Sequence, residues 1–269
     1  MQDERLACAI RAALWAGKDI LDIYEDPHAD FAVEHKADHS PLTIADKRAN
    51  ERITGLLAET TLPLLSEEGK HTDYAVRKTW KALWIVDPLD GTKEFIKRNG
   101  EFTVNIALVE NGVPVMGVVY IPVRRELYYA EESLGAYKAT GIDYRSAGLS
   151  VDDLTERADR LPLEQPDTKG FVVVASRSHL SPETEDYIRR LEQAYGDLHL
   201  ISCGSSLKIC RVAEGTADIY PRFAPTMEWD TAAGHAIARA AGKNIYHIDE
   251  KTPLRYNKEE LLNPWFIVK

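Results

Sequence analysis

Apolar residues at the start of the chain recur with the spacing of an amphipathic helix, about 3.6 residues per turn. The positions on this one face are Leu6, Ala9, Ile10, Ala13, Leu14, Gly17, Ile20, Leu21 and Tyr24. After a polar loop, a second helical pattern follows Thr43 and includes Ile53, Leu56 and Leu57. Both helices are expected to bury one face in a core.

Strand-like runs and turn signals follow. The predicted strands of the first half cover residues 62–65, 82–86, 102–108, 113–121, 126–130 and 135–139. Asn111-Gly112 is a strong hairpin signal between two of them. From residue 102 onward the pattern predicts an antiparallel meander, so the first half is expected to be α+β.

The second half alternates strands and helices more regularly. Polar residues 140–169 contain several Gly and Pro and are expected to connect two lobes. The predicted elements that follow are strand 171–175, helix 182–195 after Ser181, strand 198–203, helix 207–213, strand 217–220 and helix 231–241, which Gly242 ends. We expect an N-terminal lobe over residues 1–145 and a C-terminal lobe over 146–269.

Composition narrows the class of protein. The 269 residues are 44% hydrophobic, enough to fill the core of one large domain or of two lobes. The net charge of -10 argues against a partner that is a nucleic acid polymer. No apolar run approaches the roughly 18 residues of a membrane span, and the first residues lack a secretory pattern. We therefore expect a cytoplasmic protein without stable membrane insertion.

The strand at residues 82–86 leads into a motif of acids, proline and glycine. Pro88 fixes its own φ and favours an extended Asp87, so the strand is expected to stop there with the carboxylate projecting beyond the sheet. The Leu89 carbonyl and the Asp90 carboxylate can return to the same point, and such hard oxygen ligands suit Mg²⁺. Backbone N–H groups from Gly91 onward favour a phosphate. An ordinary turn with solvated carboxylates is the alternative.

Other acidic residues lie at the ends of predicted elements. Glu67 follows a short strand and precedes Asp87 by about twenty residues, which leaves room for a loop and a return strand. Asp46 lies near the start of the second helix, where the helix dipole alone favours an acid. Asp230 is expected as the N-cap of the last helix, a role compatible with metal binding, and His235 as a core histidine of that helix.

These motifs resemble the lithium-sensitive, magnesium-dependent phosphatases typified by inositol monophosphatase. The resemblance rests on residues 67–68, 87–92 and 229–234, which occur in the order and separation of that family, and it covers nearly the whole chain. It implies a layered αβαβα sandwich of the inositol monophosphatase and fructose-bisphosphatase type, classed as α+β or α/β, with the site between its lobes. It also implies two or three Mg²⁺ ions, two of them roughly 3.5–4 Å apart.

Within that superfamily, residues 87–105, 176–179, 204–208 and 220–223 resemble the CysQ-type 3'(2'),5'-bisphosphate nucleotidases. That branch converts adenosine 3',5'-bisphosphate to AMP and phosphate by attack of a metal-activated water, so this small molecule is the implied partner. The resemblance leaves open the oligomeric state and peripheral association with the inner face of the cell membrane.

The resemblance also implies a role for each matched residue. The implied metal ligands are Glu67, Asp87, the Leu89 carbonyl, Asp90 and Asp230. The implied catalytic residues, which orient and activate the water, are Asp46, Glu67 and Thr92. The implied substrate-binding residues are Gly91, Thr92, Lys93, His179, Ser205, Lys208, Arg222 and Asp230. Surface or structural roles remain the alternative for His179, Ser205, Lys208 and Arg222.

Three other functions are consistent with parts of the sequence. An aspartyl-phosphate phosphatase would use an Asp-x-Asp nucleophile motif, but two residues separate Asp87 from Asp90, and the other acidic motifs would have no role. A non-catalytic metal and nucleotide sensor would be expected to lack Asp46 or Thr92, and both are present. An inositol monophosphatase-like sugar phosphatase remains the third.

Overall fold

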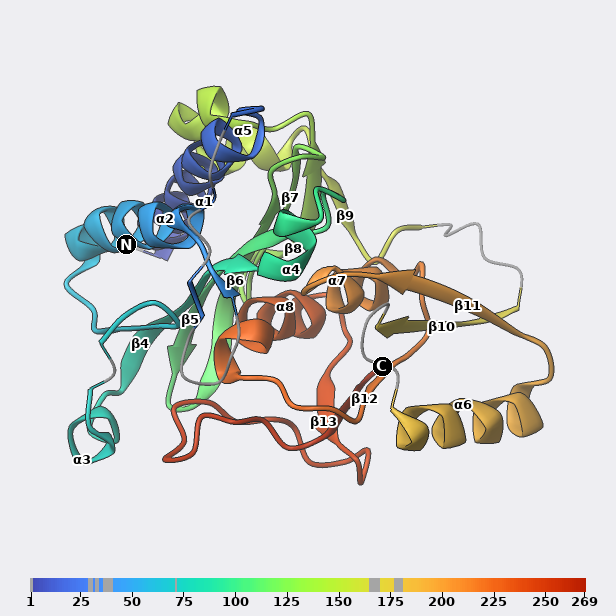
Figure 1. The fold of residues 1–269 in the computed structure, drawn as a ribbon. Coiled ribbons are helices and arrows are strands. Elements are labelled where there is room, and N and C mark those ends of the chain that lie inside the picture. Colours follow the sequence, from blue (N-terminus) through green and yellow to red (C-terminus); the bar gives the residue numbers. More distant parts are fainter. Residues whose placement is uncertain are drawn as a thin grey trace.

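The chain forms five layers, which alternate helices and sheets (Figure 1). The computed structural model describes residues 2–28, 31, 34–35, 41–70, 72–164, 170–176 and 181–269. Its helices are α1 (Gln2–Tyr24), α2 (Ile44–Leu57), α3 (Tyr74–Arg77), α4 (Thr92–Ile96), α5 (Val151–Thr155), α6 (Pro182–Tyr195), α7 (Leu207–Glu214) and α8 (Glu228–Ala240), with 3₁₀ turns η1 (Ala58–Thr60) and η2 (Tyr144–Gly148). Its strands are β1 (Glu34–His35), β2 (Pro41–Leu42), β3 (Leu64–Ser66), β4 (Ala82–Asp90), β5 (Thr103–Glu110), β6 (Val113–Ile121), β7 (Glu126–Glu131), β8 (Gly135–Thr140), β9 (Asp159–Leu161), β10 (Phe171–Ser176), β11 (Leu198–Cys203), β12 (Tyr220–Arg222), β13 (Ile245–His247) and β14 (Phe266–Val268).

A seven-stranded sheet carries most of the first half. Its strands follow chain order from β3 to β9, with β3 and β4 parallel and all later neighbours antiparallel. Between β5 and β6, Asn111 (φ 51°) and Gly112 (φ 76°) form the predicted hairpin turn. The predicted meander is therefore confirmed.

Alternating side chains of this sheet fill two cores. In β4, Trp84 and Val86 point toward α1 and α2, whereas Leu83 and Ile85 point toward α7 and α8. Beyond α7 and α8 lie the parallel pair β10 and β11 and then α6, which packs Ile188 against Val173 and Ile219. Figure 1 shows this order, from the blue helices to α6, as the αβαβα sandwich that the resemblance implied.

Three expectations from the sequence are corrected. The stretch 140–169 is more than a connection, because it contains α5 and β9, and β9 adds the seventh strand by pairing with β8. Strand β12 begins at Tyr220, although Ile219 already bridges to Val173. Helix α8 begins at Glu228, three residues before the predicted start. The division into lobes between residues 145 and 146 remains a prediction.

Within the described ranges, no helix combines the length and the apolar composition that crossing a bilayer requires.

The contact between β6 and α8 leaves no room for a side chain at Gly117. A Cβ there would lie 2.3 Å from the Ala233 carbonyl oxygen and 2.9 Å from the Ala236 Cβ. We expect Gly117→Ala to lower the free energy of unfolding by roughly 1–3 kcal/mol or more, because this is the usual cost of overpacking. The matched control is Gly55→Ala in α2, where nothing lies within 4 Å of the added Cβ. It should raise stability by about 0.5–1 kcal/mol through helix propensity. Equal urea midpoints for the two variants would contradict the packing argument.

His235 of α8 is the core histidine that the sequence predicts. It is 1% exposed, and its ring nitrogens lie 2.9 Å from the Tyr256 hydroxyl and 2.6 Å from Asn244 Oδ1. Burial lowers the pKa of His235 to about 3. Because the unfolded residue has a pKa of about 6.5, the unfolded chain binds the extra proton between these values.

We therefore expect the stability that His235 contributes to be complete above about pH 6.5 and to fall as the pH falls toward 3. The measurement is the free energy of unfolding of the wild type minus that of His235→Gln, at several pH values. This difference should shrink with acidification. A difference that stays constant would contradict a neutral buried imidazole.

Candidate active site

Strand β4 delivers two aspartates to its carboxyl end through a bulge. The register shifts between Asp87, opposite Asn105, and Asp90, opposite Thr103. The strand therefore continues to Asp90 and does not stop at Asp87, as the sequence suggested, because a bulge accommodates Pro88, which has no N–H to donate. Asp87 is 1% exposed, and its Oδ1 accepts a hydrogen bond of 3.0 Å from the Leu89 amide.

Four carboxylates from three parts of the chain lie within electrostatic reach of one another. The Glu67 amide donates to the Val86 carbonyl (3.1 Å), which places Glu67 beside β4. Burial raises the pKa of Asp87 well above its usual value, and the charges of Glu67, Asp90 and Asp230 raise it further. Burial and then Asp90 and Glu67 likewise raise the pKa of Asp230. The predicted acidic residues therefore form one cluster of mutually repelling charges.

Asp90 is held by hydrogen bonds from two other parts of the chain. Its Oδ2 accepts hydrogen bonds from the Ser206 amide (2.7 Å) and from Asn105 Nδ2 (3.4 Å). Burial raises the pKa of Asp90 to about 6, while the nearby Lys208 charge opposes that rise. Asp90 thus has one oxygen bound to the scaffold, and its second oxygen can serve a ligand.

Asp230 and Asp46 share one local geometry. The N-cap of α8 is Met227, so Asp230 is the third helical residue and not the predicted N-cap. Its Oδ2 accepts a hydrogen bond from the Met227 amide (2.8 Å), as Asp46 Oδ2 does from the Thr43 amide (2.8 Å). Each acid therefore fixes its helix start with one oxygen. The structural role expected of Asp46 and its place in the site are compatible.

The other oxygen of Asp46 meets Thr92. Thr92 Oγ1 lies 3.2 Å from Asp46 Oδ1 and 3.4 Å from the Leu89 carbonyl oxygen. Since a hydroxyl has one proton, donation to either oxygen leaves the Thr92 lone pairs able to accept. The structure thus brings together Asp46 and Thr92, two of the three residues to which the resemblance assigns water activation.

Ser205 lies against the start of α4. A Cβ at Gly91, whose φ is 94°, would lie 3.4 Å from the Ser205 Cβ. Ser205 Oγ is buried and has no hydrogen-bond partner within the described residues. Lys93, at the beginning of α4, is exposed. His179 lies outside the described residues.

Two cations lie close to the acidic cluster. Lys208 is 6% exposed, and its Nζ donates to the Ser205 carbonyl (2.6 Å) and the Cys203 carbonyl (3.4 Å). Arg222 Nη2 donates to the Pro225 carbonyl (3.1 Å), and its buried Nε has no partner in the described part of the chain. The Arg222 charge opposes the rise in the pKa of Asp230. An anion that reached Arg222 Nε would satisfy this donor.

Sequence reasoning did not assign a role to the polar network behind Asp90. Ser206 Oγ lies 2.8 Å from Asn105 Oδ1 and 2.9 Å from Thr103 Oγ1, all of them buried. Two polar residues at 103 and 105, directly before the apolar run 106–109, were the available signal. The network ties β5 to the start of α7. Two of its residues, Ser206 and Asn105, also donate hydrogen bonds to Asp90.

In the parts of the chain that the structure describes, no three His, Cys, Asp or Glu side chains form a ready-made metal site. The donor set nevertheless consists of carboxylate and carbonyl oxygens alone, which matches a hard divalent cation in atom type. Burial and the neighbouring carboxylates raise the pKa of Asp87 and of Asp230, and a bound cation would offset this repulsion.

Comparisons with known proteins agree on one family. The profile of the inositol monophosphatase family matches residues 1–265. The 3'(2'),5'-bisphosphate nucleotidase CysQ of Salmonella typhimurium is 45% identical over 255 residues, which cover 94% of each chain. The corresponding CysQ of Escherichia coli K12 is 44% identical over 256 residues, again 94% of each chain.

Solved structures show the same relationship. The crystal structure of CysQ from Bacteroides thetaiotaomicron, described as a bacterial member of the inositol monophosphatase family, is 62% identical, with a TM-score of 0.92 over 100% of this chain and 97% of the other. An IMPase from Thermotoga maritima is 25% identical, with a TM-score of 0.74 over 99% of this chain and 92% of the other. This chain therefore belongs to the inositol monophosphatase family.

Proposed function

We propose that this chain is a Mg²⁺-dependent 3'(2'),5'-bisphosphate nucleotidase, which hydrolyses the 3'-phosphate of adenosine 3',5'-bisphosphate to give AMP and phosphate. The observation that carries the proposal is the cluster of four carboxylates, of Glu67, Asp87, Asp90 and Asp230, with the Asp46–Thr92 pair beside it. Asp87 is buried and the other three are partly buried. The names of the relatives that are 44–62% identical support the choice of substrate.

The acidic cluster would hold the metal ions. Glu67, Asp87, the Leu89 carbonyl, Asp90 and Asp230 are the proposed ligands, and four carboxylates balance the charge of two divalent ions. When bound, Mg²⁺ supplies Lewis-acid stabilisation of the phosphoryl oxygens and of the leaving oxygen, and it lowers the pKa of a coordinated water. The proposed site holds two or three Mg²⁺ ions.

The residues of this chain then position the nucleophile. Thr92 donates its proton to Asp46, so its oxygen lone pairs can accept a hydrogen bond from the attacking water. Glu67, whose amide bonds to the Val86 carbonyl of β4, is the proposed acceptor of the water proton. This arrangement favours direct attack in line with the leaving ribose oxygen, without a phospho-enzyme.

The start of α4 is the proposed place of the scissile phosphate. The amides of Glu94 and Phe95 donate to the Gly91 carbonyl (2.8 and 2.9 Å). The two amides before them, of Thr92 and Lys93, are the groups that could face the phosphate. Ser205, Lys208 and Arg222 are proposed to contact the rest of the nucleotide, and His179 keeps its predicted role there.

The test is release of phosphate from adenosine 3',5'-bisphosphate by the purified chain, with Mg²⁺ and after chelation of the metal. We expect turnover with Mg²⁺, its loss on chelation and its return when Mg²⁺ is restored. A parallel assay with inositol 1-phosphate distinguishes a general sugar phosphatase. Equal kcat/KM for both substrates would overturn the nucleotidase assignment, and binding without turnover would indicate a sensor.

A further inference from the structure

Glu101 joins two parts of the chain that are distant in sequence. It lies two residues before β5 and is 7% exposed, and its Oε2 accepts a hydrogen bond of 2.9 Å from the Gly204 amide, 103 positions later. Gly204 begins the loop of residues 204–206 between β11 and α7, called here the Ser205 loop. The resemblance implies no role for Glu101 or for Gly204.

The backbone of Glu101 packs against both loops of the candidate site. A Cβ added at Gly204 would lie 2.9 Å from the Glu101 carbonyl oxygen, and one added at Gly91 would lie 3.2 Å from the same atom. Gly91 precedes α4, where the scissile phosphate is proposed to bind, and Figure 1 shows α4 and α7 side by side. The Ser205 loop therefore has little room to move toward α4.

The hydrogen bond to Gly204 acts on Lys208 through the backbone. Lys208 Nζ donates to the carbonyls of Cys203 (3.4 Å) and Ser205 (2.6 Å), the two residues that flank Gly204. Because a peptide unit is planar, the Gly204 N–H and the Cys203 carbonyl turn together. An acceptor that fixes the Gly204 amide therefore also fixes an oxygen that holds Lys208.

The far end of the Ser205 loop has its own anchors. The Ser206 amide donates to Asp90 Oδ2 (2.7 Å), and the Ser206 hydroxyl lies 2.8 Å from Asn105 Oδ1. Ser206 thus ties the loop to the proposed metal side, whereas Glu101 ties its first residue. Loss of the Glu101 contact is expected to disturb Ser205 and Lys208 while Asp90 stays in place.

The two carboxylate oxygens of Glu101 have different partners, which mutations can separate. Arg124 Nη2 lies 3.3 Å from Glu101 Oε1, and the Arg124 side chain is 32% exposed. Exposed ion pairs contribute little, so the loss of Arg124 should have a small effect. A buried amide that loses its acceptor, by contrast, incurs its full desolvation penalty. The Gly204 contact is therefore the one that should matter.

We propose that Glu101 is a positioning residue for nucleotide recognition. Through the Gly204 amide it fixes the Ser205 loop, so that Ser205 and Lys208 face the part of the substrate that the metal ions do not bind. Glu101 itself does not touch the substrate. This inference rests on the proposed function, in which Ser205 and Lys208 contact the nucleotide.

The test compares two probes by calorimetry of the full chain with Mg²⁺, namely AMP, which carries the nucleotide, and inorganic phosphate, which needs the metal side alone. Glu101→Ala should weaken AMP binding about tenfold or more, because the lost hydrogen bond is charge-assisted, and should change phosphate binding by less than about twofold. Glu101→Gln keeps an acceptor for the Gly204 amide, so its AMP affinity should be within about threefold of the wild type. In turnover, Glu101→Ala should raise KM more than it lowers kcat.

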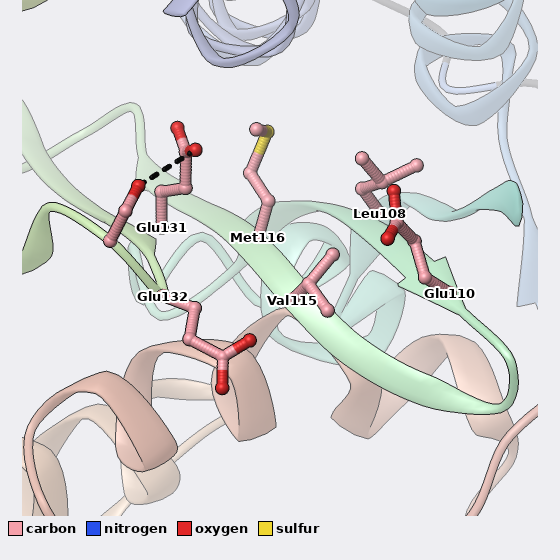
Figure 2. Close-up of a pocket in the computed structure, with 7 residues that line it drawn as sticks. Leu108, Glu110, Val115, Met116, Glu131 and Glu132 are labelled. Atoms are coloured by element: carbon pink, nitrogen blue, oxygen red, sulfur yellow. Dashed lines mark hydrogen bonds between the residues drawn. The ribbon is translucent and has the colours of Figure 1, made fainter. Parts of the chain in front are cut away.

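Two control variants belong to this test. Arg124→Met removes the ion-pair partner of Glu101 and leaves the Gly204 contact in place. Glu110→Ala removes a glutamate at the other end of β5, where it lines the pocket drawn in Figure 2. The Glu110 side chain is 40% exposed, and its Oε1 lies 3.7 Å from Arg5 Nη1. Both variants should bind AMP within about twofold of the wild type.

Three results would overturn the role of Glu101. They are an unchanged AMP affinity in Glu101→Ala, a loss in Glu101→Gln as large as in Glu101→Ala, and equal weakening of AMP and phosphate, which would indicate a general loosening of the site. If Glu101→Ala fails to fold, Gly204→Ala tests the same contact from the loop and should weaken AMP binding more than phosphate binding, whereas wild-type affinity for AMP would refute the role.

This inference and the proposed function fail separately. An inactive wild-type chain would refute the proposed function, and AMP binding would still report on Glu101. An active wild type with unchanged AMP binding in the variants would refute the role of Glu101 alone.

Discussion

Replacing Asp90 with asparagine is expected to reduce kcat/KM for adenosine 3',5'-bisphosphate by about a thousandfold or more. The loss of one charged ligand removes several kcal/mol of metal-dependent stabilisation, and about 1.4 kcal/mol corresponds to a factor of ten. The asparagine carbonyl oxygen can take the place of Asp90 Oδ2 and still accept from the Ser206 amide and Asn105 Nδ2. The fold should therefore be retained.

The same substitution should not lower thermal stability in the absence of added metal. Burial and the Glu67 charge raise the pKa of Asp90 to about 6, so its charged form at neutral pH opposes folding. Removing that charge should leave Tm unchanged or raise it, while Mg²⁺ should raise the Tm of the wild type more than that of the variant. Asp22→Asn, an exposed acid paired with Lys18, is the charge control and should leave turnover unchanged.

Two outcomes would contradict the role of Asp90. Near-normal kcat at saturating Mg²⁺ would show that Asp90 is not a ligand. A large fall in Tm would show that it is chiefly a structural residue, because the lost turnover would then follow from misfolding. Asp90→Asn is thus informative through activity and stability together.

The acidic cluster could be predicted because each acid lies at the end of an element that the apolar pattern marks. Asp87 and Asp90 end β4, Glu67 follows β3, and Asp230 begins α8. The nine residues of β4 and the 13 residues of α8 are enough for the apolar pattern to locate both elements within a few residues. What placed the acids in one cluster was the family resemblance, since periodicity alone gives no distance between elements.

Contacts that depend on tertiary structure had no such signal. Ser206 and Asn105 are 101 positions apart, and their hydrogen bond arises only because α7 starts against the end of β5. Strand β9 has three residues, and Asp159 and Arg160 are exposed, so no apolar alternation marks it. Pairing with β8 makes it a strand. The bulge at Pro88 likewise depends on the partner strand, so the sequence suggested an end where β4 continues.

The second large effect concerns recognition of the phosphate that the metals do not bind. A bisphosphate must leave one phosphate away from the acidic cluster, in a chain of net charge -10 that would otherwise repel it. Arg222 is the candidate partner, because its buried Nε has no acceptor in the described residues and its charge already acts on Asp230. A charge-assisted hydrogen bond to phosphate contributes roughly 1.5–3 kcal/mol.

We therefore expect Arg222→Met to reduce kcat/KM about 10–100-fold for adenosine 3',5'-bisphosphate. For adenosine 3'-monophosphate, which differs only in lacking the 5'-phosphate, the variant should be nearly as active as the wild type. The pair of enzymes and the pair of substrates form a double-mutant cycle that isolates the contact. Arg189→Met, which removes an exposed arginine of α6, is the matched control.

Lys208 should behave differently from Arg222, because the structure buries it. Its Nζ is already held by the Ser205 and Cys203 carbonyls, and its charge lies near Asp90. Lys208→Met is therefore expected to lower kcat/KM for both substrates, by disturbing the Ser205 loop and the field at the metal site. A loss for Arg222→Met that is equal on both substrates, or absent, would remove the physical basis for bisphosphate selectivity. Selectivity would then have to come from contacts to the base or the ribose, which a panel of nucleotides lacking either group would locate.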